Sequence, residues 1–245
     1  MAQPNSMKCK EIFLSAPRKI VRNKIRQKVH FFPQAIALSE KGKPGNDLQV
    51  HVQGEGGDFF LPLQMHYCVA VQTMPEGSLH RVYHDHQYGF PIENDNELFG
   101  RLLLEINQAG LSWTTILKKQ DNFRKAYAEF DVASIAAFGP EETGRLMADA
   151  GIIRNRLKIE AAIFNAQKVL QLQQQHGSFF RWLNEHHPQS KSGWTKLFRK
   201  TFRFTGGEIV GEFLMSTGFL PGAHLPECPV FEKTRRAGAT YFVSP

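Results

Sequence analysis

The pattern of apolar and polar positions predicts a helix that begins near Asn94 and ends at Gly110. Asn94 or Asp95 can cap its first turn, and glycine is common at helix ends. Residues at spacings of three and four lie on one face of a helix. That face would carry Leu98, Leu102, Glu105 and Ala109. One acidic residue would therefore share a face with apolar neighbours.

The same periodicity continues through the rest of the chain. We expect helices over residues 141–150, 154–174 and 207–217, with two shorter helices around Trp182 and Trp194. One edge of the longest helix carries Leu157, Ala161, Phe164 and Lys168. Alternating patterns typical of strands are scarce. The sequence therefore predicts an all-α fold class.

Residues 1–64 differ in composition from residues 65–245. They hold ten Lys and Arg against five Asp and Glu, whereas the remainder holds 20 against 18. Residues 18–29 have the pattern of a basic amphipathic helix, and residues 43–47 and 54–58 have the composition of turns or linkers. Three interpretations stay open: a targeting or nucleic-acid-binding arm, a flexible tail, and a start codon placed too far upstream. We expect an N-terminal extension followed by one main domain.

Length, composition and charge narrow the function classes. The chain has 245 residues, of which 42% are hydrophobic, enough for a globular core. It has no stretch of 18 or more apolar residues, and the apolar run near the N-terminus is too short for a secretory signal. Most of the net charge of +7 lies in residues 1–64, so it says little about what the main domain binds. We expect a cytoplasmic protein, with targeting by the basic segment left open.

Cysteine and histidine positions raise the question of a metal site. Three distant cysteines, an odd number, do not form a disulfide framework. Two sulfurs and two nitrogens come from opposite ends of the main domain, on Cys68, His84, His224 and Cys228. Thiolate and neutral imidazole are preferred Zn²⁺ ligands, and four protein ligands without an open position are typical of structural zinc. The alternative is that Cys68 and Cys228 are small buried residues; Cys9 is expected to be free.

Glu105 is the most informative carboxylate of the chain. On an apolar helical face it would be partly desolvated, which is costly without partners. Either it reaches solvent or a basic residue at the edge of the helix, or it is an acceptor at the floor of a pocket. Tyr83 and Trp113 would add two π faces, which suit a flat, electron-poor ligand. Ordinary core packing is the alternative for Trp113.

Residues 198–207 connect the last two predicted helices through a turn with two glycines. Such a hairpin can hold a phosphate on exposed backbone N–H groups at the N-terminus of the second helix. Arg199, Lys200 and Arg203 would add salt-sensitive contacts. A plain connection between two helices is the alternative.

Several separated motifs follow one another along the chain. They are Tyr83-His84-Asp85-x-x-Tyr88-Gly89-x-Pro91, Gln108-Ala109-Gly110-Leu111-Ser112-Trp113, Ala150-Gly151-Ile152-Ile153-Arg154-Asn155-Arg156-x-Lys158-Ile159, Phe202-x-Phe204-x-Gly206 and the His-x3-Cys pair at 224–228. Together they resemble the DNA-3-methyladenine glycosylase I family. The resemblance covers about residues 65–230, with the motifs in the family's order. It departs at three positions. Tyr88 and Ala70 stand where tryptophan is expected, and Gly211 replaces a common tyrosine.

The resemblance implies an all-α helix-hairpin-helix DNA repair enzyme. It would hydrolyse the N-glycosidic bond of 3-methyladenine in alkylated double-stranded DNA and leave an abasic site. By resemblance, Glu105 is the catalytic residue, and Tyr83, Tyr88 and Trp113 surround the base. The resemblance also assigns DNA contacts to Gly110, Leu111, Thr205 and Gly206, and a structural Zn²⁺ to Cys68, His84, His224 and Cys228. We expect a monomer.

The chemistry of the implied substrate fits these residues. Methylation at N3 places positive charge on the adenine ring, which an aromatic face and a carboxylate both favour. No lysine is assigned as a Schiff-base nucleophile, so we expect no strand cleavage. Three alternatives stay open: a zinc-stabilised DNA-binding protein without activity, a glycosylase for another alkylated base, and a zinc hydrolase. Four protein ligands argue against the hydrolase.

Overall fold

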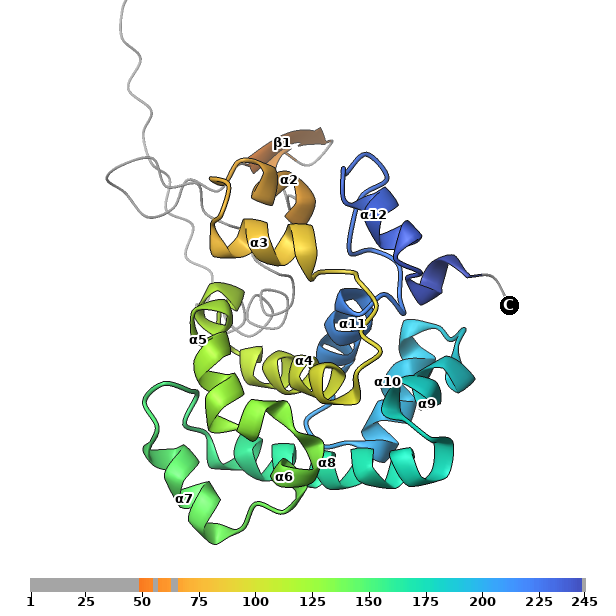
Figure 1. Cartoon of the computed structure of the whole chain (residues 1–245). Helices are drawn as coiled ribbons and strands as arrows, with labels where there is room; N and C mark the ends of the chain where they lie inside the picture. The colour runs from red at the N-terminus through yellow and green to blue at the C-terminus, as the bar shows by residue number, and fades with distance from the viewer. Residues whose placement is uncertain (1–48, 55–56, 63–65, 244–245) are drawn as a thin grey trace, which may run out of the picture. The chain divides into compact units, whose positions relative to one another are not determined.

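The computed structural model describes residues 49–54, 57–62 and 66–243. From residue 66 onward the described chain is built from helices (Figure 1). The predicted all-α class is therefore confirmed for this part of the protein. The basic helix expected at 18–29, the linker expected at 43–47 and Cys9 lie outside the described residues.

A β-hairpin lies within the segment that the sequence analysis assigned to the extension. Strands β1 (Gln49–Gly54) and β2 (Gly57–Pro62) pair antiparallel, and Gly54 lies opposite Gly57 next to the turn. Gly54, Gly57 and Asp58 of the expected linker thus belong to paired strands. The strands were not predicted, because six residues offer too few alternations to distinguish a strand from a linker.

Eleven α-helices and two short 3-10 helices make up the described chain from residue 66. The first six α-helices are α2 (Tyr67–Gln72), α3 (Leu79–His86), α4 (Asp95–Gln108), α5 (Trp113–Ala126), α6 (Val132–Ala136) and α7 (Pro140–Ala148). The others are α8 (Arg156–His176), α9 (Phe179–His186), α10 (Lys191–Thr201), α11 (Gly207–Ser216) and α12 (Phe231–Arg236). The 3-10 helices are η1 (Ala128–Phe130) and η2 (Thr240–Phe242). Each helix predicted after residue 93 has a counterpart, whereas α2, α3, α5, α6 and α12 were not predicted individually.

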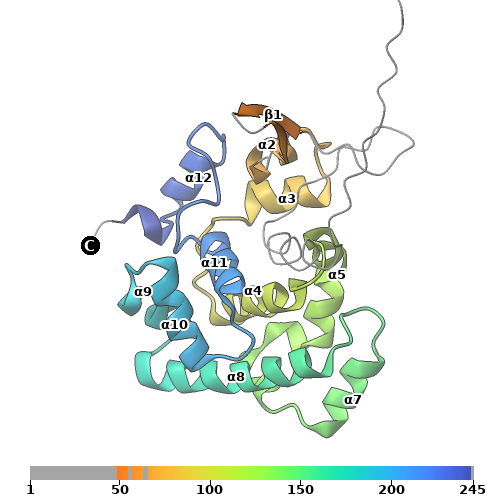
Figure 2. The same cartoon turned by 180° about the vertical axis from the view of Figure 1, so that it is seen from behind.

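Helix α4 is the central helix of the helical region. It begins where predicted, because the Asn94 side chain accepts hydrogen bonds from the backbone N–H groups of Asn96 and Glu97. It contacts α5, α8, α9 and α11, which lie around it in Figure 1 and Figure 2. All residues from 98 to 107 are buried, so α4 has no solvent-facing side in this stretch.

Helix α8 buries a different set of positions from the predicted edge. Ala161 is buried as expected, but Leu157 is 62% exposed. The buried side consists of Lys158, Ile159, Ala161, Ala162, Asn165, Ala166, Val169 and Leu172. Two of these residues are polar, and both make contacts that shape the functional region.

Aromatic packing holds α9, α10 and α11 together. The rings of Phe179 and Phe213 are stacked, with centroids 6.2 Å apart, and Trp182 packs on Phe198 at 5.9 Å. Trp194 is fully buried. The two tryptophans therefore anchor α9 and α10 as predicted, and this packing supports the connection between α10 and α11. None of the helices in the described residues is long and apolar enough to cross a membrane.

Candidate functional site: a metal cluster beside an acidic aromatic pocket

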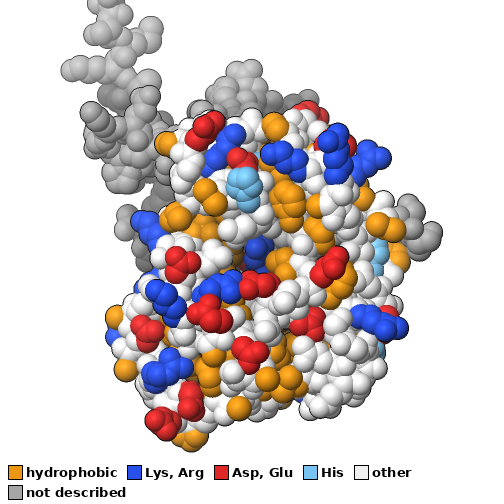
Figure 3. Space-filling model, in the orientation of Figure 1, with side chains coloured by type: hydrophobic (Ala, Val, Ile, Leu, Met, Phe, Trp, Pro, Cys, Tyr) orange, Lys and Arg blue, Asp and Glu red, His pale blue; other side chains and the backbone are white. Residues whose placement is uncertain are grey.

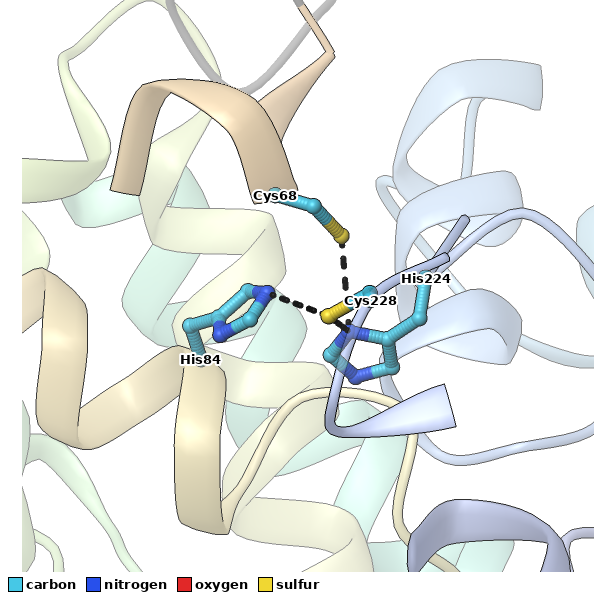
Figure 4. Close-up of side chains that lie close together, drawn as sticks. All are labelled: Cys68, His84, His224 and Cys228. Carbon is cyan, nitrogen blue, oxygen red and sulfur yellow. Dashed lines mark hydrogen bonds between the residues drawn. The ribbon is translucent and has the colours of Figure 1, made fainter. Parts of the chain in front are cut away.

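Four side chains from distant parts of the chain meet at one buried point (Figure 4). They are Cys68 of α2, His84 of α3, and His224 and Cys228 from the loop between α11 and α12. Each offers one ligand atom, and these atoms all lie within 4.8 Å of one another. The structure thus brings together the four residues that the sequence analysis grouped.

The distances between these atoms fit a tetrahedral metal ion. Cys68 Sγ lies 3.5 Å from His224 Nδ1, and Cys228 Sγ lies 3.6 Å from His84 Nε2 and 3.7 Å from His224 Nδ1. Bonds of about 2.3 Å to sulfur and about 2.0–2.1 Å to nitrogen place the two elements about 3.6 Å apart on a tetrahedron. The cluster could therefore hold a metal ion.

The hydrogen bonds of both histidines direct a lone pair toward the cluster. Nδ1–H of His84 donates to Asp85 Oδ1 at 2.7 Å, and Nε2–H of His224 donates to the Tyr88 carbonyl at 2.7 Å, because both oxygens can only accept. Burial lowers the pKa of both imidazoles, that of His224 to about 4, so the neutral, metal-binding form is favoured. Asp85 also accepts from Arg81 Nε at 2.8 Å, so it orients His84.

The surroundings of the cluster are poorly solvated and leave little space. Burial raises the pKa of the Cys68 thiol to about 12, so a thiolate at this place needs a positive charge beside it. Gly89 has a φ of +79°, and a Cβ there would lie 2.9 Å from Cβ of Ala223 and 3.1 Å from Cδ2 of His224. Only glycine allows the backbone to pass this close to a metal ligand.

Three aromatic rings lie together next to the cluster. The centroid of the Tyr83 ring lies 5.1 Å from that of Trp113 and 5.5 Å from that of Tyr88. All three residues are buried. The face turned to the viewer in Figure 3 is hollowed near its middle, in the region where α3 and α4 approach each other. The structure therefore assembles the predicted aromatic group.

Glu105 is 4% exposed and belongs to the same region. Burial raises its pKa to about 8; Glu212 adds to this rise, whereas Arg101 and Ser216 oppose it. Burial also raises the pKa of Tyr83 well above its usual value, and the Glu105 charge adds to that rise. Glu105 does not reach solvent at the edge of the helix, because α4 is buried on all sides here; the basic residue that acts on it is Arg101.

Arg101 is a charged residue of this region that the sequence analysis missed. It is 7% exposed, and its Nη1 donates to the Tyr83 hydroxyl at 3.2 Å and to the Ser216 carbonyl at 3.4 Å. Its guanidinium carbon lies 5.1 Å from the centre of the Tyr83 ring. The available signal was a single charge inside the apolar run 98–104.

Glu212 is the second missed charge. The Tyr88 hydroxyl donates to Glu212 Oε2 at 3.4 Å. Burial raises the Glu212 pKa to about 7, against the effect of Lys191. Here too the signal was one acidic residue inside an apolar helical run, from Ile209 to Leu214.

The turn after α4 presents an apolar side chain to solvent. Gly110 has a φ of +85°, and Leu111 is 38% exposed. The Nζ of Lys158 donates to the carbonyls of Asn107 and Ala109 at 3.0 and 2.9 Å, which holds the end of α4 and the start of this turn. Gly110 and Leu111 therefore form an exposed turn whose start is held by Lys158.

The connection between α10 and α11 is held by one buried amide. Asn165 of α8 accepts from Arg203 N at 2.8 Å and donates to the Arg203 carbonyl at 3.1 Å. The Thr205 hydroxyl donates to the Phe202 carbonyl at 3.2 Å, and the residue is 4% exposed, so its side chain belongs to the support of the turn. A Cβ at Gly206 would meet nothing within 4 Å, which leaves the start of α11 open.

Comparisons with known proteins agree with this arrangement. A family described as methyladenine glycosylase matches residues 74–232. DNA-3-methyladenine glycosylase 1 of Escherichia coli (strain K12) is 37% identical over 169 residues, which cover 61% of this chain and 90% of that protein.

Solved structures of 3-methyladenine DNA glycosylase I are also similar to this chain. The structure of 3-methyladenine DNA glycosylase I from Staphylococcus aureus, which concerns 3-methyladenine recognition, matches with a TM-score of 0.57 and 31% identity, covering 64% of this chain and 93% of that one. A Tyr-to-Phe variant of 3-methyladenine DNA glycosylase I in complex with 3-methyladenine matches with a TM-score of 0.59 and 30% identity, covering 64% and 94%. With a family match over more than half of its length, the chain belongs to the methyladenine glycosylase family.

Proposed function

We propose that this protein hydrolyses the N-glycosidic bond of 3-methyladenine in alkylated double-stranded DNA at a pocket built on Glu105. The observation that carries the proposal is a carboxylate buried in the same region as Tyr83, Tyr88 and Trp113. The activity is that of a DNA-3-methyladenine glycosylase, the enzyme of the curated relatives. The products are the free base and an abasic site.

Recognition rests on the charge of the damaged base. N3-methylation makes the adenine ring cationic while it is bonded to the sugar, and stacking a cation on an aromatic face gains roughly 0.5–2 kcal/mol. Glu105 accepts from the amino group of the base and, when ionised, favours the positive ring. Because burial holds the pKa of Glu105 near 8, an arriving cation would lower that pKa and ionise the carboxyl. Neutral adenine brings no such gain.

Trp113 offers a further contact for the base. Its indole Nε1–H is buried and has no hydrogen-bond partner within the described chain. Buried donors are normally satisfied, so an unpartnered one in an aromatic pocket suits a ligand acceptor. This supports Trp113 as part of the pocket rather than as core packing alone.

Bond cleavage needs little help with the leaving group. The positive charge on the base is neutralised as the glycosidic electron pair moves to the ring, and water adds to the oxocarbenium-like sugar. Glu105 and the DNA phosphates stabilise the positive sugar. Lys158 is the buried lysine of the described residues, and its amine is held by two carbonyls of α4. It is therefore not free to form a Schiff base, which agrees with a monofunctional enzyme without strand cleavage.

The exposed turn and the α10–α11 hairpin are proposed as the DNA contacts. A base on which an enzyme acts must leave the stack, and apolar side chains inserted at a base step favour this. Leu111, carried by Gly110, is such a side chain. The open N-terminus of α11 at Thr205 and Gly206 would hold a backbone phosphate on N–H groups. The proposed contacts are therefore one to the base step, through Leu111, and one to the DNA backbone, through the start of α11.

Zn²⁺ is proposed as the metal of the Cys2His2 cluster. Two sulfurs, two nitrogens and tetrahedral distances fit this ion, and four protein ligands leave no position for substrate. The ion would supply a cross-link between α2, α3 and the segment before α12. We assign it a structural role in a monomeric glycosylase domain over residues 65–245, preceded by the extension over 1–64.

Identification of the released base tests this function. A duplex treated with a methylating agent carries several alkylated bases, and mass spectrometry of the released bases should show mainly 3-methyladenine, with abasic but unbroken strands. The matched control is Glu105→Gln, which should release far less base while binding the duplex with similar affinity. Binding without release would indicate a DNA-binding protein, and release of a different base would indicate another specificity.

A further inference from the structure

Helix α11 brings a second, half-buried carboxylate, that of Glu212, to the region of Glu105. It packs against α4, the helix that carries Glu105. After burial itself, the charge of Glu212 is the next cause of the raised pKa of Glu105. A carboxylate that acts on Glu105 in this way lies in the same poorly solvated region. The mechanism above uses only Glu105, so Glu212 needs its own explanation.

Glu212 is connected to the aromatic group through Tyr88. The Tyr88 hydroxyl donates to its Oε2 at 3.4 Å, and the Tyr88 ring lies 5.5 Å from the Tyr83 ring. The family usually has tryptophan at the position of Tyr88, so this phenol hydroxyl departs from the usual pattern. The unusual Tyr88 and the second carboxylate, Glu212, are therefore linked by a hydrogen bond.

Gly211, a second departure, belongs to the same arrangement. A Cβ at Gly211 would lie 2.7 Å from Cε and 3.0 Å from Nζ of Lys191. Lys191 therefore crosses α11 at this glycine, and its Nζ donates to Glu208 Oε2 at 3.1 Å. Its positive charge also lowers the pKa of Glu212 against the effect of burial. The tyrosine common in the family would displace this lysine.

A buried guanidinium opposes recognition of a cation in this pocket. Arg101 lies beside the Tyr83 ring and is almost fully buried. With Arg101 charged, an ionised Glu105 alone leaves this buried group without net charge. A cationic base would then meet no net attraction, since the two opposite charges largely cancel at a distance. A second ionised carboxylate restores a net negative charge.

We propose that Glu212 is a specificity-determining residue of the base pocket. Its carboxylate offsets the charge of Arg101, and its hydrogen bond to Tyr88 holds the ring that lies next to Tyr83. Glu212 thereby favours cationic alkylpurines over neutral purines of the same shape, without touching the base. The inference rests on the proposed function.

The test compares a cationic with a neutral ligand in the Glu212→Gln variant. Single-turnover excision from a duplex with 3-methyladenine measures the recognition and release of the cationic base. Binding to a duplex with 3-deaza-3-methyladenine, a neutral and uncleavable analogue, reports on shape alone. We expect excision to fall about tenfold, the effect of one partly screened charge, and affinity for the neutral duplex to change by less than about twofold. Equal losses in both assays, or unchanged excision, would overturn the inference.

Two further variants separate charge from structure. Glu185→Gln removes the same charge on α9 at a half-exposed site, away from the residues assigned to base and DNA, and should leave excision unchanged within about twofold. Combining Arg101→Met with Glu212→Gln removes both offsetting charges and should recover part of the excision lost in Glu212→Gln. A further loss would contradict the charge offset.

The variant Glu105→Gln distinguishes this inference from the proposed function. If it loses excision while Glu212→Gln keeps the wild-type rate, the glycosylase function stands and the role of Glu212 is wrong. If the wild-type protein itself releases no 3-methyladenine, the proposed function fails first.

Discussion

Replacing Glu105 with glutamine is expected to raise the stability of this protein and to lower its activity. Burial raises the pKa of Glu105 from 4.5 to about 8, with a further contribution from Glu212 and opposition from Arg101 and Ser216. Between these two pH values the folded protein keeps a proton that the unfolded chain has lost. The folded state binds more protons, so the free energy of unfolding decreases as pH rises from about 4.5 through about 8. Glutamine has the same shape and does not titrate, so the free energy of unfolding of the variant does not show this decrease.

The size of the effect follows from the same pKa difference. A carboxyl with these two pKa values, once fully ionised, lowers stability by on the order of 4–5 kcal/mol. On the order of 3 kcal/mol of this develops between pH 5.5 and pH 9. Glu105→Gln should therefore be clearly more stable than the wild type at pH 9 and much closer to it at pH 5.5.

Urea unfolding of both metal-loaded proteins at the two pH values measures this difference. The metal ligands are the same in both proteins, so their own pH dependence cancels. Excision of 3-methyladenine by the stabilised variant should fall by about a hundredfold or more, the usual cost of removing one electrostatic stabiliser. A stability difference that does not change with pH would refute the buried, protonated Glu105. If the variant excised 3-methyladenine at the wild-type rate, Glu105 would have no part in the chemistry.

Three other changes test separate parts of the structure. Cys68→Ala should lose stoichiometric metal, measured by elemental analysis, together with several kcal/mol of stability; a folded, active, metal-free variant would contradict the structural site. Leu111→Ala should lower excision from duplex DNA about tenfold without weakening the binding of free 3-methyladenine base, and equal weakening of both would argue against a wedge. Asn165→Ala should cost roughly 2–4 kcal/mol in thermal unfolding, because two backbone groups of Arg203 lose their partner. It should also weaken duplex binding, with Asn184→Ala as a control on a half-buried helical asparagine.

Local sequence signals predict the position of α4 well. The cap at Asn94, the apolar spacing and the glycine after the last turn are all interactions within a few residues. The same signals underestimate its burial, because they describe one face and not the helices that cover the others. Leu157 of α8 shows the converse error, since an apolar residue in a helical pattern is left exposed when no neighbouring element reaches it.

The polar contacts of the pocket could not be predicted in the same way. Arg101 and Glu212 are visible in the sequence as lone charges in apolar runs, but their partners are far away in the chain. The Tyr88–Glu212 hydrogen bond spans 124 residues, and the Arg101–Ser216 bond spans 115. From the sequence alone Lys158 would likewise be expected at the surface, because its two carbonyl partners at the end of α4 are far away in the chain.

The order of residues along this chain specifies helix positions, the four cysteine and histidine residues that could hold a metal, and Glu105, because caps, periodicity and ligand chemistry are properties of residue types at given spacings. The packing of α3, α4, α5 and α11 around one another specifies which of those groups share a low-dielectric region. Charge in such a region depends on every neighbour within several ångströms. The balance among Glu105, Glu212 and Arg101 is therefore a property of the folded protein, and no pattern within the sequence contains it.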